Sequence, residues 1–171
     1  MCIDVKVWLA TYYGVSSRDI DNILKDEKAT SYLLTWSIFE QEIFNGFMET
    51  SKIKSIAKKL AKHYSDLDVE VIARDFHSRY QDANNYRHLI HKKDNSDFKL
   101  IIRKAFDDIS ESEKLELLFF VAYRYRNNIF HGNKKVEAWT KYTKQIGDCI
   151  IFITKIIDLN KKESIITKRN Q

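Results

Sequence analysis

The sequence contains no proline and only four glycines among its 171 residues. Sheets and sandwiches need turns rich in these two residues, so their scarcity argues against a β-rich fold. The two cysteines, Cys2 and Cys149, cannot build a disulfide framework, and their spacing matches no metal-binding motif. We therefore expect a mostly helical protein in a reducing compartment.

Signals for export, for membrane insertion and for a domain boundary are also missing. The N-terminus lacks a basic region followed by an apolar core and a cleavage site, and the apolar stretch at 149–157 is short and contains Lys155. No repeat or Gly/Ser/Pro linker divides the chain. These observations predict one cytoplasmic domain over 1–171 that uses no membrane, with a core at about 30–160 and a basic, frayed tail at 161–171.

What is present is an apolar fraction of 44%, a charged fraction of 31% and a net charge of +5. This suits a globular protein and is compatible with a polyanionic partner. We expect one helix to start at Thr30 and another at the Ser110-x-x-Glu113 capping box. Residues 84–96 are expected to form a loop or a broken helix. Periodicity and capping predict helices at 3–13, from 17, 32–49, 52–64, 68–80, 97–106, 110–130 and 136–160. The predicted fold class is all-α, a helical bundle with a four-helix core.

Two charged residues interrupt the apolar stripes of these helices. At about 100° per residue, Glu40 falls near the middle of one stripe and Arg126 near the middle of another. A charge in such a place is costly unless it is paired or reaches a water-filled cleft. We expect Glu40 and Arg126 to form a pair at a helix interface. Two alternatives stay open: the pair could be purely structural, or both side chains could be long enough for their charged groups to reach water. The stripes are Leu33, Trp36, Ile43, Phe44 and Phe47, and Leu115, Leu118, Phe119, Ala122 and Ile129.

His131 follows Arg126 by five residues and precedes Gly132. Five positions apart on an ideal helix, two side chains point about 140° away from each other. Arg126 and His131 therefore converge only if the helix ends before the histidine, which Gly132 favours, or across a symmetric interface. Asn127 could orient the imidazole. Arg124 is expected on the opposite, solvent-facing side of the helix.

The segment Arg126, Asn127, His131, Gly132 resembles the signature of the HEPN superfamily, in which an arginine and a histidine stand at the end of a helix in a small helical bundle. The resemblance implies a four-helix, HEPN-like core. It also implies that an acidic residue of an earlier helix joins the site, and Glu40 is the matching candidate.

The activity implied by the resemblance is that of a metal-independent endoribonuclease, a toxin or an anti-phage defence effector, acting as a homodimer. His131 would be the acid–base catalyst and Arg126 the phosphate ligand, with Arg124, Lys134 and Lys135 binding the RNA. Attack by the ribose 2′-OH would leave a 2′,3′-cyclic phosphate and a 5′-OH. No metal or cofactor is implied, and an antitoxin or defence protein is a possible further partner.

Two other readings use the same residues. A non-catalytic HEPN-like module would bind RNA or protein with Arg126 and His131 as ligands, and a regulatory subunit of a defence or toxin–antitoxin complex would use Glu40 and Arg126 as a core pair.

Histidines and aromatic residues elsewhere are less informative. His77, His88 and His91 lack a fourth ligand at a familiar spacing and are expected to be exposed rather than metal-bound. The aromatic side chains could stack on RNA bases, but core or dimer-surface positions are the expected ones. They are Trp8, Tyr12, Tyr13, Trp36 and Trp139.

Overall fold

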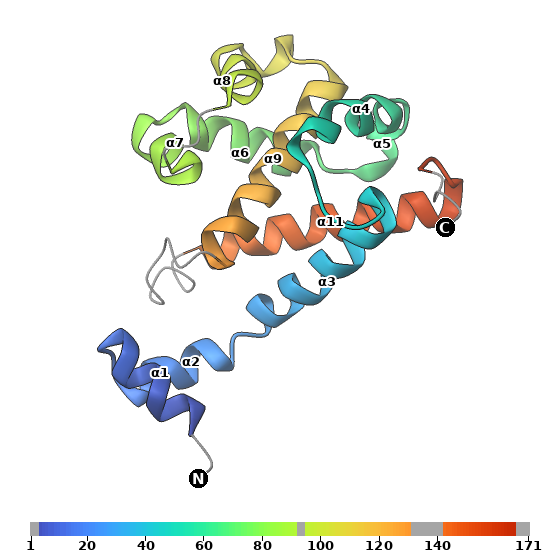
Figure 1. Ribbon diagram of the computed structural model, residues 1–171. Coiled ribbons are helices and arrows are strands. Elements are labelled where there is room, and N and C mark those ends of the chain that lie inside the picture. Colours follow the sequence, from blue (N-terminus) through green and yellow to red (C-terminus); the bar gives the residue numbers. More distant parts are fainter. Residues whose placement is uncertain (1–3, 92–94, 131–141, 167–171) are drawn as a thin grey trace.

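The computed structural model describes residues 4–91, 95–130 and 142–166, and these residues form helices and turns without a strand (Figure 1). The predicted all-α fold class is therefore confirmed. The finer expectation of a HEPN-like four-helix core stays a prediction. In the described part of the chain no helix combines the length and the hydropathy that crossing a membrane requires.

The described part of the chain is built of helices and short 3-10 turns. In chain order they are α1 Val5–Tyr13, α2 Ser17–Leu24, α3 Glu27–Phe44, α4 Thr50–Leu60, the 3-10 turn η1 Ala61–His63, α5 Tyr64–Leu67, α6 Glu70–Gln81, α7 Ala83–Ile90, α8 Ser96–Arg103, the 3-10 turn η2 Phe106–Asp108, α9 Glu111–Phe130 and α11 Thr143–Glu163.

Several helix starts are set by side-chain caps. The backbone N–H of Ser110 donates to Glu113 Oε2 at 2.9 Å, and the N–H of Glu113 donates to Ser110 Oγ at 3.3 Å. This reciprocal pair is the capping box that the sequence predicts at the start of α9. The carboxylate of Asp4 likewise accepts from the N–H groups of Lys6 and Val7, which confirms a helix in the first segment.

Both ends of α3 differ from the predictions. α3 begins at Glu27, where Asp26 accepts from the N–H of Lys28, so Thr30 is not its N-cap. The same helix ends at Phe44, because Asn45 adopts a left-handed conformation that stops it. In the region 84–96 the structure agrees with the broken-helix alternative, because α7 ends at Ile90 and α8 starts at Ser96.

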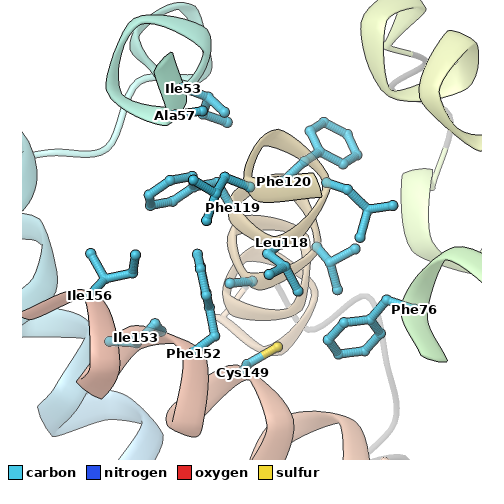
Figure 2. Close-up of a cluster of buried hydrophobic side chains, with 14 of the residues drawn as sticks. Ile53, Ala57, Phe76, Leu118, Phe119, Phe120, Cys149, Phe152, Ile153 and Ile156 are labelled. Carbon is cyan, nitrogen blue, oxygen red and sulfur yellow. The ribbon is translucent and has the colours of Figure 1, made fainter. Parts of the chain in front are cut away.

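The core is organised around α9, which crosses α11 and is covered by α4, α6, α7 and α8 (Figure 1). The ring of Phe119 stacks on Phe39 of α3 at 5.9 Å and meets Phe152 of α11 edge-on at 5.0 Å. Figure 2 shows side chains of α4, α6 and α11 pointing toward α9 from several directions. Every residue from Leu115 to Ala122 is buried, so this part of α9 is enclosed on all sides.

The buried face of α3 is shifted from the predicted stripe. Tyr32 and Phe39 are buried together with the expected Trp36 and Ile43. Phe47, which the stripe included, is 81% exposed because it lies in the connection after the end of α3.

Candidate functional site

Helices α3 and α11 meet around the C-terminal half of α9. From α3, the hydroxyl of Tyr32 donates to the carbonyl oxygen of Ala122 at 2.6 Å. From the start of α11, the ring of Tyr142 meets that of Tyr125 at 5.9 Å. α3 and α11 also pack against each other, so these helices surround the end of α9 that carries Arg126.

Arg126 lies on the face of α9 that is directed toward α3 and α11. It follows Ala122 by four residues and Phe119 by seven, positions that share one face of a helix, and both of these residues contact α3. The predicted position of Arg126 on an apolar face is confirmed. The side chain is half-buried, and its Nη1 donates to Asn127 Oδ1 at 3.0 Å.

Glu40 is not paired with Arg126. Its Oε1 accepts from the backbone N–H of Met48 at 3.0 Å and so closes the connection between α3 and α4. Phe39, next to Glu40, contacts Phe119, which precedes Arg126 by seven residues or roughly 10 Å along the helix axis. The predicted ion pair is therefore wrong, because helical periodicity locates the face of a residue but not its height along a neighbouring helix.

Arg124 was expected to face solvent, and this prediction is also wrong. The residue is only 5% exposed, its Nε donates to the carbonyl oxygen of Leu89 at 3.1 Å, and its Nη2 donates to that of Ile90 at 2.7 Å. Burial lowers the pKa of the guanidinium from its usual value. Asn128 Nδ2 donates to Leu89 as well. Arg124 therefore satisfies the last carbonyls of α7, a structural task, because α9 has no solvent face at this position.

The remaining predicted site residues divide into two groups. Asn127 is buried, and its amide oxygen holds Arg126. His131, Lys134 and Lys135 lie outside the described residues. The role of Asn127 toward the imidazole, and the roles of the other three residues, stay predictions.

Two cations near the same end of α9 had not been predicted. The guanidinium of Arg79, on α6, lies over the ring of Tyr142 at 5.9 Å, and its Nε is buried without a hydrogen-bond partner among the described residues. The ammonium of Lys28 lies 4.0 Å from the point that a Cβ atom on Gly147 would occupy. Nothing in the local sequence signals either position, because each depends on how α3, α6 and α11 pack.

The histidines of the described residues do not gather into a site. His77 was expected to be exposed, but it is only 2% exposed and packs edge-on against Phe106 at 5.3 Å. Burial lowers the pKa of its imidazole. His88 and His91 are exposed. In residues 4–91, 95–130 and 142–166 no cluster of three or more His, Cys, Asp or Glu residues is arranged to hold a metal ion.

Comparison of the chain with protein-family models, with curated proteins and with solved structures finds no match.

Proposed function

We propose that the protein is a metal-independent endoribonuclease of HEPN type, acting as a toxin or anti-phage effector. RNA would be cleaved by attack of the ribose 2′-OH on the adjacent phosphate, leaving a 2′,3′-cyclic phosphate and a 5′-OH. The observation that best supports this proposal is the Arg126–Asn127 hydrogen bond near the end of α9, in the segment that leads to His131.

The contact with Asn127 gives Arg126 a defined orientation. A guanidinium binds phosphate oxygens through charge-assisted hydrogen bonds, and the side chain of Arg126 is only half-buried, so a ligand can reach it. Such a contact would neutralise charge that develops on the phosphorane, which is the usual catalytic role of an arginine at a transferring phosphate. In this proposal Asn127 is a positioning residue, because it orients Arg126 and does not itself contact the phosphate.

His131 would supply the proton transfers of the reaction. An imidazole with a pKa near neutrality can accept the proton of the 2′-OH or donate one to the leaving 5′ oxygen. One imidazole cannot readily do both on opposite sides of the phosphorus. A homodimer that brings two copies of Arg126 and His131 to one cleft supplies both groups through an isologous interface.

The charge around this end of the molecule suits an RNA substrate. Lys28 and Arg79 approach the start of α11 from α3 and α6, and the whole chain carries a net charge of +5. Cations of this kind attract the phosphate backbone without reading its sequence. Lys134 and Lys135 belong to the same proposed surface by their position in the sequence.

Variants of the two motif residues test the proposal. Arg126→Ala and His131→Ala should each lower RNA cleavage by roughly 100-fold or more. Arg103→Ala replaces an exposed arginine of α8 and serves as the matched control, with activity expected to equal that of the wild type. If either motif variant cleaves RNA as well as the control does, the proposed mechanism is excluded.

A non-catalytic RNA-binding module is the second candidate, because the same cations would hold RNA without cleaving it. RNA binding that weakens steeply with salt, with no product formed by the wild type, would favour this candidate over the nuclease.

A further inference from the structure

Helix α1 exposes an apolar face to solvent. Trp8 and Tyr12 are 54% and 69% exposed, and their rings stack on each other at 5.2 Å. Val5 is also exposed and, three residues before Trp8, lies on the same face of the helix. Exposed aromatic and aliphatic side chains gathered on one face mark a contact surface more often than scattered single ones do.

The opposite face of α1 packs against only a few apolar side chains. Ala10 and Ile20 form a small hydrophobic cluster of their own with Leu9 and Val15, separate from the main core. Figure 1 shows α1 and α2 as a pair at one end of the molecule, joined to the rest through α3. Helices of nine and eight residues are too short to be stable alone, so this pair needs additional burial. A helix that is apolar on both faces is typically covered on both.

Exposed apolar side chains also occur on α3, which follows the pair directly. Leu34 and Ile38 are exposed on α3, four residues apart on one side of the helix. The exposed side chains on the Trp8 face of α1 and on this side of α3 offer an area on the order of 600 Å², the lower end of what one partner contributes to a specific protein interface. They are Val5, Trp8, Tyr12, Leu34 and Ile38.

The charge of this region argues against a phosphate-rich partner. Residues 4–26 contain four aspartates and three basic residues, which gives a net charge of −1, whereas the whole chain carries +5. One of the three cations, Lys6, is already paired with Asp21 at 2.6 Å. RNA or an anionic membrane would meet little attraction here, while another protein surface would bury the aromatic face without an electrostatic penalty.

We propose that a second copy of this chain covers the apolar surface of α1 and α3, so that this N-terminal region forms the homodimer interface. The inference rests on the proposed function, whose composite cleft is incomplete in one chain. The new element is the identity of the surface through which the two chains bind each other. Because a two-fold interface pairs one patch with itself, the exposed Trp8 and Tyr12 of each chain would be buried by its partner.

Oligomeric state, measured by analytical ultracentrifugation over a micromolar concentration series, tests this interface. The wild type should be a dimer, and Trp8→Glu/Tyr12→Glu should raise its dissociation constant at least roughly 100-fold. Leu34→Glu should weaken the dimer without touching α1 or α2, which guards against simple loss of the short helices. Leu100→Glu is the matched control, because Leu100 is 58% exposed on α8, and it should leave the dimer intact.

Several results would overturn the inference. These are a wild type that stays monomeric over the series, or a double variant and a Leu34→Glu variant that both dimerise like the control. A different result would assign the surface to base stacking on RNA. In that case the wild type would be monomeric, single-stranded RNA would quench its tryptophan fluorescence, and the double variant would show no such quenching.

Failure of the proposed function gives a different pattern. If the wild type dimerises through this surface but does not cleave RNA, the interface stands and the nuclease proposal fails. If the double variant still dimerises and still cleaves RNA, the nuclease stands and the interface fails.

Discussion

Replacing Arg124 by alanine should destabilise the protein far more than replacing Arg126, although only one residue separates them. The guanidinium of Arg124 is buried and donates to the carbonyl oxygens of Leu89 and Ile90. Each hydrogen bond that involves a charged group contributes about 1.5–3 kcal/mol, and the truncation would also leave a cavity and two buried carbonyls without this donor. We expect Arg124→Ala to lower the free energy of unfolding by about 3–5 kcal/mol.

Arg126→Ala should behave differently. The side chain is half-buried and bonds its neighbour Asn127, while Glu40 has its own partner in the N–H of Met48 and is not stranded by the change. A smaller loss than that of Arg124→Ala is expected, because removing a half-buried side chain leaves a smaller cavity and a smaller desolvation cost than removing a buried one. Its main effect should be on RNA cleavage.

Urea unfolding followed by far-UV circular dichroism measures both losses, with Arg103→Ala as the surface control. A free energy of unfolding for Arg124→Ala within about 1 kcal/mol of the wild type, or a larger loss for Arg126→Ala than for Arg124→Ala, would refute the structural role assigned to Arg124. The second result would indicate that Arg126 stabilises the core.

Two further changes test the local structure. Ser110→Ala removes the hydroxyl that caps α9, so the free energy of unfolding should fall by about 1 kcal/mol, and urea unfolding indistinguishable from that of the wild type would contradict the capping box. His77→Phe tests the buried imidazole, whose pKa burial lowers below its ordinary 6.5. As pH falls below 6.5 the unfolded chain binds a proton that the folded chain does not, so wild-type stability should drop by at most about 1.4 kcal/mol per pH unit until the lowered pKa is passed. The variant should lose this part of the pH dependence, and identical slopes for the two proteins between neutral and mildly acidic pH would show that His77 does not titrate in this way.

The helices could be predicted from the sequence because their signals are local. The capping box at Ser110 and Glu113 and the apolar periodicity of α4 and α6 depend only on neighbours along the chain. The start of α3 was missed because Asp26 competes with Thr30 as a cap, and both are residue types that favour this position.

The site could be predicted only in part. The face occupied by Arg126 follows from helical periodicity and is found where expected. The environment of Arg124 does not follow, because amphipathic reasoning assumes that a helix has one solvent face and α9 has none over most of its length. The partner of Glu40 depends on the relative height of α3 and α9, which is a property of tertiary packing.

The most direct test of the central claim is to incubate the wild-type protein with total RNA in the presence of EDTA and to identify the ends of the products. The proposed chemistry predicts fragments with 2′,3′-cyclic phosphate and 5′-OH ends, formed without a divalent metal. Cleavage that requires a metal ion, or fragments with 5′-phosphate ends, would contradict it.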